Sequence, residues 1–303
     1  MEIKRFAIQS NYDSLPLSCV LYVPSGEKKG IVQLVHGMSE HKERYLPFMQ
    51  FLCENGYVAF CHDHRGHGDS VQSEEDRGWF HDFDGKAVVD DAVQMTSFLK
   101  AEYPGLPLTL FGHSMGSMVV RCYAREHDDL IDNLVVCGSP SKNPLAGLAI
   151  FVEKCIRLSK GERHRSKMLA YLSTGKGDKN FPGEGRGAWL SRNRPNIDAY
   201  QNDPKSGFTF TCNGFENLFK LMKYTYQKKG YLVKNPALPI HFVSGKDDPV
   251  AESESKWQQS IEFMRKLGYT QVSGKMYEGM RHEILNELDN GEVYADLLAF
   301  VEK

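Results

Sequence analysis

The sequence lacks long hydrophobic runs. The longest stretch made only of apolar residues and glycine, 145–152, has eight residues, whereas a membrane-spanning helix needs about 20. The first ten residues place Glu2, Lys4 and Arg5 among apolar positions and so lack the apolar core of a secretory signal. We therefore expect a cytoplasmic protein without a membrane span.

Cysteine pairs are also missing. The seven cysteines are odd in number and form no CxxC motif or metal-ligand spacing, which argues against a disulfide framework or a zinc site. Several lie inside apolar stretches, as Cys61 and Cys137 do, so we interpret them as reduced, buried thiols. No repeat or low-complexity tract is present, the net charge is only −2, and we expect no nucleic-acid partner.

Strand and helix patterns alternate through the first 140 residues. This alternation predicts a mostly parallel sheet covered by helices on both faces, which is an α/β fold. In such sheets ligands bind at the carboxyl ends of the strands. The predicted strands are 3–8 and 15–23 (an opening hairpin), 31–35, 57–61, a strand ending before the turn at 112–116, and 130–137; the predicted helices are 45–54, 84–103 and 117–126.

The alternation stops near residue 138 and resumes at a strand over 238–244. The intervening stretch is too long for a simple loop, so we predict an α/β core over 1–139 and 236–303 and an inserted, mainly helical cap over 140–235. A helix over 253–267, a strand over 272–277 and a final helix over 292–301 complete the core.

A Gly-x-Ser-x-Gly pentapeptide lies between a β-prone run and a helical pattern. This strand, turn and helix is the context of a nucleophile elbow, in which the residues two before and two after the serine must be small. Gly112 and Gly116 meet that demand. Ser114 is therefore the candidate nucleophile, and it needs a base, an acid and two oxyanion donors elsewhere in the chain.

The acid and the base follow in the order that this elbow requires. After the strand at 238–244 come Asp247 and Asp248, and either could orient an imidazole, although an aspartate before Pro249 is also typical of a plain turn. After the last strand comes His282. A serine, an acid and a histidine in this order, each after a strand, predict a catalytic triad.

Two backbone N–H groups are candidates for the oxyanion hole. The N–H of Met115 follows the nucleophile at a helix N-terminus, where the helix dipole favours negative charge. The second donor should come from the turn after the strand 31–35, and we choose Met38. The loop at 63–70 holds several histidines and acids but lacks the spacing of a metal site, and we expect no metal and no cofactor.

Taken together, these motifs resemble the monoacylglycerol lipase and lysophospholipase group of α/β-hydrolases, of the serine aminopeptidase S33 type. The resemblance implies that Ser114 is the nucleophile, that Asp248 rather than Asp247 is the acid, and that His282 is the base. The matching motifs are His36-Gly37-Met38-Ser39-Glu40-His41 with Arg44-Tyr45, Asp63-His64-Arg65-Gly66-His67-Gly68, the turn at 112–116, Gly245-x-x-Asp248-x-Val250, Gly279-x-x-His282-Glu283, and, in the cap, Trp189-Leu190-Ser191-Arg192 with Tyr200-x-x-Asp203-Pro204.

The resemblance also implies the oxyanion roles of Met38 and Met115, and we expect His36, Gly37 and His113 to contact the substrate. The implied activity is hydrolysis of a small lipid-like ester, a monoacylglycerol or a lysophospholipid. The alternatives are a serine aminopeptidase or a short-chain carboxylesterase on the same fold, and a binding module without catalysis. The cap departs most from the family pattern, so it leaves the substrate open.

Charge is unevenly distributed between the two predicted parts. Residues 141–235 carry 18 Lys and Arg against 7 Asp and Glu, whereas the remainder carries 19 against 32. A basic surface that only faces water explains this pattern. The alternative is peripheral contact with an anionic membrane, with 145–152 as the apolar contact.

Overall fold

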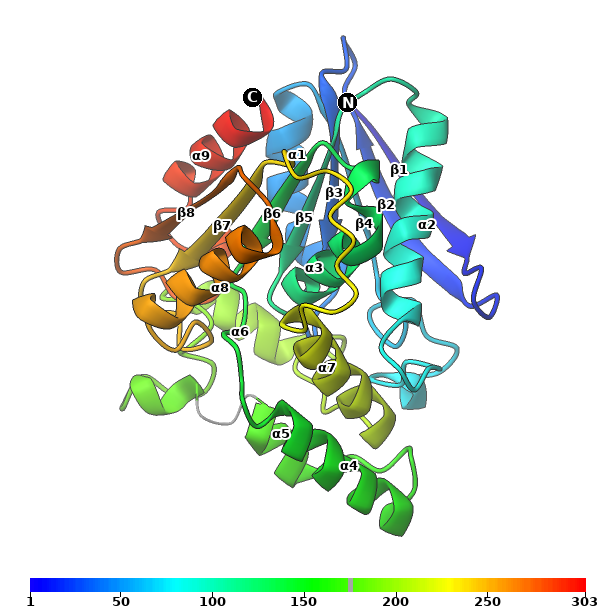
Figure 1. Ribbon diagram of the computed structural model, residues 1–303, viewed down its shortest axis with the longest axis vertical. Helices are drawn as coiled ribbons and strands as arrows, with labels where there is room; N and C mark the ends of the chain where they lie inside the picture. Colours follow the sequence, from blue (N-terminus) through cyan, green and yellow to red (C-terminus); the bar gives the residue numbers. More distant parts are fainter. Residues whose placement is uncertain (174–176) are drawn as a thin grey trace.

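A computed structural model describes residues 1–173 and 177–303 of the chain. Within them lies an eight-stranded sheet in the order β1-β2-β4-β3-β5-β6-β7-β8. Strands β3 to β8 run parallel, whereas β2 is antiparallel to both β1 and β4, so the predicted opening hairpin forms one edge of the sheet (Figure 1). The strands are β1 Glu2–Gln9, β2 Pro16–Val23, β3 Gly30–Val35, β4 Tyr57–His62, β5 Leu108–His113, β6 Asn133–Cys137, β7 Ile240–Gly245 and β8 Val272–Tyr277.

Helices cover both faces of the sheet (Figure 1). Successive strand residues point to opposite faces, and in β3 Ile31 packs in one apolar cluster while Val32 packs in the other. The fold is therefore the α/β-hydrolase fold expected from the sequence. One face is covered by α1 Leu46–Glu54 and α9 Gly291–Val301, and the other by α2 Ala87–Glu102, α3 Met115–His127 and α8 Glu254–Leu267.

Several boundaries differ from the prediction for local reasons. Helix α2 begins at Ala87 rather than at residue 84, because the Asp82 carboxylate accepts hydrogen bonds from the backbone N–H groups of Lys86 and Ala87, both at 3.0 Å. Strand β6 begins only at Asn133. The chain before it forms a short 3₁₀ turn, Asp128–Leu130, and the described residues hold four more, Lys42–Tyr45, Glu74–Asp76, Gly177–Asn180 and Ile284–Asn286.

The chain between β6 and β7 forms a helical insertion. In it α4 packs on α7, and α7 in turn packs on α3 of the core. Figure 1 shows α4 and α5 at the end of the molecule opposite the two termini. The predicted limits of this cap, 140–235, stay a prediction. Its helices are α4 Ala146–Lys160, α5 Lys167–Ser173, α6 Arg194–Asn202 and α7 Cys212–Thr225.

Over residues 1–173 and 177–303, no helix combines the length and the apolar character needed to cross a bilayer.

Candidate active site

Ser114 is the single residue between β5 and α3. Its backbone has φ 54° and ψ −118°, a left-handed conformation that is strained for a residue with a side chain. The turn requires glycine two residues before and two residues after Ser114. A Cβ on Gly116 would lie 2.1 Å from the carbonyl oxygen of Val35, and one on Gly112 would lie 2.4 Å from the carbonyl oxygen of Gly116. The Ser114 side chain is thereby held, partly exposed, at the carboxyl end of the sheet.

His282 and Asp248 meet at the same end of the sheet. His282 Nδ1 lies 2.9 Å from Asp248 Oδ2, and both side chains are buried. Asp248 is itself held, because Oδ1 accepts the backbone N–H of Val250 at 2.9 Å and Oδ2 accepts the Ser244 hydroxyl at 3.2 Å. Asp247, by contrast, is exposed. Of the two adjacent acids, the structure therefore places Asp248 against the imidazole.

The second ring nitrogen of His282 is left for a reacting group. Within the described part of the chain, Nε2 is buried and has no hydrogen-bond partner. A Cβ on Gly138 would lie 3.2 Å from Cε1 of the same ring, and the residue before it, Cys137, accepts the backbone N–H of Ser114 at 2.9 Å. The end of β6 thus lies between the nucleophile and the histidine.

The two candidate oxyanion donors also flank Ser114. Met115 is the first residue of α3, and the turn after β3 touches the nucleophile, because a Cβ on Gly37 would lie 3.1 Å from Cβ of Ser114. Met38 follows directly. His36 is fully buried, and its Nε2 accepts the backbone N–H of His64 at 2.9 Å. Its side chain therefore supports this turn and offers no exposed surface for a substrate.

His113 is buried as well and links the elbow to the histidine loop. Its Nε2 lies 3.2 Å from the carbonyl oxygen of His282, and its Nδ1 lies 3.0 Å from the Tyr45 hydroxyl and 3.3 Å from Glu40 Oε1. Burial alone would lower the pKa of His113, but the hydrogen bond that His113 donates to Glu40 and the negative charge of Glu40 outweigh burial and leave that pKa raised. When protonated, the ring can donate from both nitrogens, to the Glu40 carboxylate and to the carbonyl oxygen of His282.

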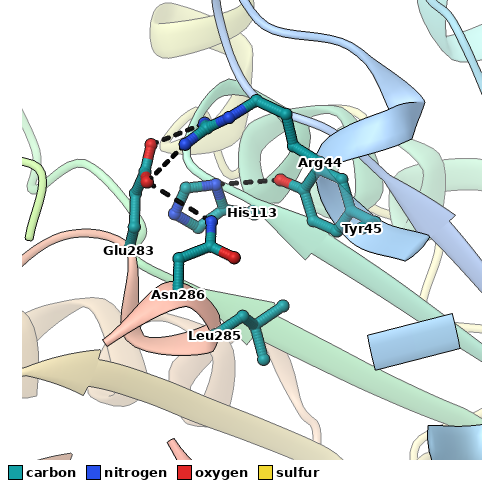
Figure 2. A pocket seen from close by; sticks show the side chains of 6 residues that line it. All are labelled: Arg44, Tyr45, His113, Glu283, Leu285 and Asn286. Atoms are coloured by element: carbon teal, nitrogen blue, oxygen red, sulfur yellow. Dashed lines mark hydrogen bonds and ion pairs between the residues drawn. The ribbon is translucent and has the colours of Figure 1, made fainter. Parts of the chain in front are cut away.

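An ion-pair network surrounds His113. Arg44 pairs with Glu40 at 2.7 Å and with Glu283 at 2.6 Å. Figure 2 shows Arg44, Tyr45 and Glu283 around the His113 ring, where they border a cavity of about 10 Å³, which is room for about one water molecule. The network holds the loop after β3 against the loop that carries His282.

The sequence analysis assigns no role in the site to Glu40, Arg44 or Glu283. All three nevertheless stand in the motifs that carry the family resemblance. Charged side chains close to buried strands are usually buried only when they pair with side chains of opposite charge. That rule could have identified them as partners, but not which residue each one faces.

The chain is similar to known proteins over most of its length. The chain matches the family model described as serine aminopeptidase, S33, over residues 26–289. It is 29% identical to monoglyceride lipase of Homo sapiens over 288 residues, which cover 92% of this chain and 83% of the relative. It is 24% identical to the phospholipase YtpA of Bacillus subtilis over 276 residues, which cover 90% of this chain and 95% of that protein.

A solved structure is similar over nearly the whole chain. A thermostable carboxyl esterase from Bacillus coagulans, crystallised with glycerol, has a TM-score of 0.91 and 26% identity, and the match covers 99% of this chain and 98% of that one. The fold, the elbow and the family match over 26–289 lead to one conclusion. The chain belongs to the serine aminopeptidase S33 family of α/β-hydrolases and is related to the monoglyceride lipases.

Proposed function

We propose that this member of the lipase and esterase group of serine hydrolases cleaves carboxylic esters of lipid-like molecules, monoacylglycerols or lysophospholipids. The observation that carries the proposal is the buried Asp248–His282 hydrogen bond of 2.9 Å beside the strained Ser114. The relatives named monoglyceride lipase and phospholipase support the substrate class. In this reaction Ser114 is the nucleophile, His282 is the base, and Asp248 is the acid that orients His282.

The reaction proceeds in two steps. His282 Nε2 removes the proton from the Ser114 hydroxyl, and the oxygen attacks the ester carbonyl while the N–H groups of Met38 and Met115 bind the oxyanion. The proton then goes to the departing alcohol, which leaves an acyl-serine. Water attacks the acyl group with His282 again taking the proton. The bond from the acyl carbon to the Ser114 oxygen then breaks, that oxygen takes the proton back from His282, and the carboxylic acid is released.

The test is a matched pair of measurements. Ser114→Ala should abolish hydrolysis of a short ester, and labelling by a fluorophosphonate should be lost with it, while the circular dichroism spectrum stays the same. A panel of monoacylglycerols, lysophospholipids, short esters and aminoacyl amides then ranks the substrates by kcat/KM. Retention of most activity in Ser114→Ala would contradict the proposal.

The name of the family, serine aminopeptidase S33, makes an aminopeptidase the second candidate function. An aminopeptidase needs a free carboxylate to bind the substrate's terminal amine. Near His282, however, the buried carboxylates of Glu40 and Glu283 are both paired with Arg44. The aminoacyl amides in the panel test this candidate directly, and preferential cleavage of them would favour it over ester hydrolysis.

We also propose peripheral contact of the cap with anionic membranes. Large apolar side chains on α4 are exposed, with relative exposures of 56% for Leu148, 63% for Phe151 and 75% for Leu158. They recur at helical spacing beside exposed Lys154 and Lys160, a pattern that suits a helix lying on an anionic bilayer. This surface lies at the end of the molecule away from the termini (Figure 1).

Vesicle sedimentation tests the membrane contact. Binding should rise with the fraction of phosphatidylglycerol, fall with salt, and drop at least severalfold in Phe151→Asp. The matched control is Leu288→Asp, since Leu288 is 65% exposed but lies outside the insertion. Binding that ignores salt and lipid charge, or equal losses in both variants, would contradict this contact.

We propose a cytoplasmic location because the cysteines are free thiols. All seven are free thiols, and six of them are buried, as is usual in a reducing compartment. Fractionation of cells that express the chain with a tag at its C-terminus would test this location, and recovery from the medium would contradict it.

A further inference from the structure

A segment of the insertion lies directly against the loop that carries His282. The backbone N–H of His282 donates to the carbonyl oxygen of Trp189 at 3.4 Å, and that of Glu283 donates to the carbonyl oxygen of Leu190 at 2.7 Å. The side chains meet as well, because the indole of Trp189 and the imidazole of His282 have centroids 5.0 Å apart and planes 36° apart. One cap residue is thus in ring contact with the candidate base.

Trp189 is held firmly in this place. The Asp178 carboxylate accepts the backbone N–H groups of Gly187 at 3.0 Å and of Trp189 at 3.3 Å. Gly177 leaves room for the indole, since a Cβ there would lie 2.6 Å from Cγ of Trp189. On the side of the histidine loop, Arg281 donates to the carbonyl oxygen of the preceding cap residue, Ala188, at 2.7 Å. These hydrogen bonds fix the backbone of the chain at Trp189, and Gly177 packs against its indole.

The other groups around the His282 ring show what the indole of Trp189 adds. Asp248 accepts from Nδ1, the His113 ring lies 4.8 Å away, and Nε2 has no partner in the described part of the chain. The charged and titratable groups that face the ring are therefore Asp248 from the loop after β7 and His113 from β5, with Arg281 and Glu283 beside it in its own loop. Trp189 adds an aromatic face with partial negative charge, which attracts a cation.

We propose that Trp189 is a positioning residue for His282: its indole keeps the imidazole directed toward Ser114 and stabilises the imidazolium that forms in each step. This proposal rests on the roles that the proposed function gives to Ser114 and His282. It makes part of the insertion a component of the catalytic apparatus, in addition to any part that it plays in substrate choice.

The experiment compares Trp189→Leu, Trp189→Phe and a control, Trp257→Phe, in which the tryptophan lies in α8 and packs on Gly274 of β8. For each, kcat/KM on a short ester is measured from pH 5 to 9 and divided by the fraction of protein that a fluorophosphonate labels. Cation–π contacts suggest a loss of about 3- to 30-fold for Trp189→Leu. The acidic limb of its pH profile should also move by about half a unit or more to lower pH, because the imidazolium is less stable.

Trp189→Phe should recover most of both effects, and Trp257→Phe should show neither. If Trp189→Leu does not fold, 5,7-difluorotryptophan incorporated at position 189 keeps the shape and weakens the aromatic charge, and the same shift of the acidic limb is expected. An unmoved acidic limb in the folded variant, or an equal loss in the control, would overturn the proposal. Absence of fluorophosphonate labelling in the unaltered protein would instead overturn the proposed function, and this inference with it.

Discussion

The Asp248 carboxylate and the His282 imidazole are joined by one hydrogen bond of 2.9 Å, although 34 residues of chain separate them. The neighbouring acid, Asp247, is exposed, and its backbone N–H donates to the carbonyl oxygen of Met280 at 3.0 Å. Adjacent residues with the same side chain therefore lie in opposite environments, which makes them a natural pair for comparison.

Replacing Asp248 with Asn should lower kcat/KM for a short ester by about 10²- to 10⁴-fold, because the neutral amide can no longer hold the imidazole in the productive tautomer. Asp247→Asn is the control and should stay within about twofold of the unaltered protein, since an exposed carboxylate without a partner contributes little. Steady-state kinetics on both variants decide the matter. A large loss in Asp247→Asn together with a small one in Asp248→Asn would reverse the assignment.

Gly116→Ala should prevent formation of the active elbow. The added methyl would lie 2.1 Å from the carbonyl oxygen of Val35 and 2.5 Å from that of His36, so α3 and the end of β3 must separate. Gly147→Ala is matched to it, because a Cβ there meets nothing within 4 Å and alanine is the better helix former by about 0.5–1 kcal/mol. Fluorophosphonate labelling and thermal melting should fall in the first variant and hold or rise in the second. Normal labelling of Gly116→Ala would show that the close approach is not required.

Arg44→Met should lower the free energy of unfolding by about 3–5 kcal/mol, because it leaves the buried carboxylates of Glu40 and Glu283 without their shared cation. Arg5→Met removes an exposed pair with Glu43 and should cost less than about 1 kcal/mol. Urea unfolding at neutral pH measures both. Equal costs for the two variants would mean that the buried network contributes no more than a surface pair.

His62 should make the protein sensitive to acid. Burial, with a smaller contribution from Lys42, lowers the pKa of His62 from 6.5 to about 4, and neither ring nitrogen has a partner among the described residues. The unfolded chain, with the higher pKa, binds the proton more tightly, so this contribution to stability is complete above about pH 6.5 and is lost as the pH falls toward 4.

The measurement compares His62→Leu with the unaltered protein at pH 7.5 and at pH 5. At each pH, the effect of His62→Leu is the unfolding free energy of the variant minus that of the unaltered protein. This difference should be about 2 kcal/mol more favourable to the variant at pH 5 than at pH 7.5. His127→Leu is the control, because that histidine lies partly exposed in the last turn of α3, and its effect should change little with pH. A pH-independent effect of His62→Leu would contradict the assignment.

The fold and the elbow could be predicted from the sequence because their causes are local. Apolar runs of strand length alternate with helical periods, and that pattern by itself requires a covered, mostly parallel sheet. Gly112 and Gly116 surround Ser114 at the spacing that a strained turn demands. The order of Ser114, the aspartates and His282, each after a strand, follows from the same pattern.

Where the prediction was incomplete, the cause lies in contacts between segments distant along the chain. His36 and His113 were expected to touch substrate, yet both rings are buried and bonded within the protein. Their partners come from loops after other strands, and no spacing in the chain indicates which side chains those loops will bring together. Helix α2 begins late for a similar reason, because one nearby carboxylate, Asp82, satisfies its first backbone donors.

The amino-acid order alone determined the class of fold, the elbow that holds Ser114 and the short set of residues that are candidates for the acid and the base, because backbone strain and hydrophobic period act over a few residues. Only the tertiary structure decided that Asp248 and not Asp247 faces His282, that Arg44 holds Glu40 and Glu283 together, and that Trp189 reaches the imidazole from the insertion. These pairings depend on which side chains are buried and on which charged groups are buried next to each other. Both are properties of the packed molecule.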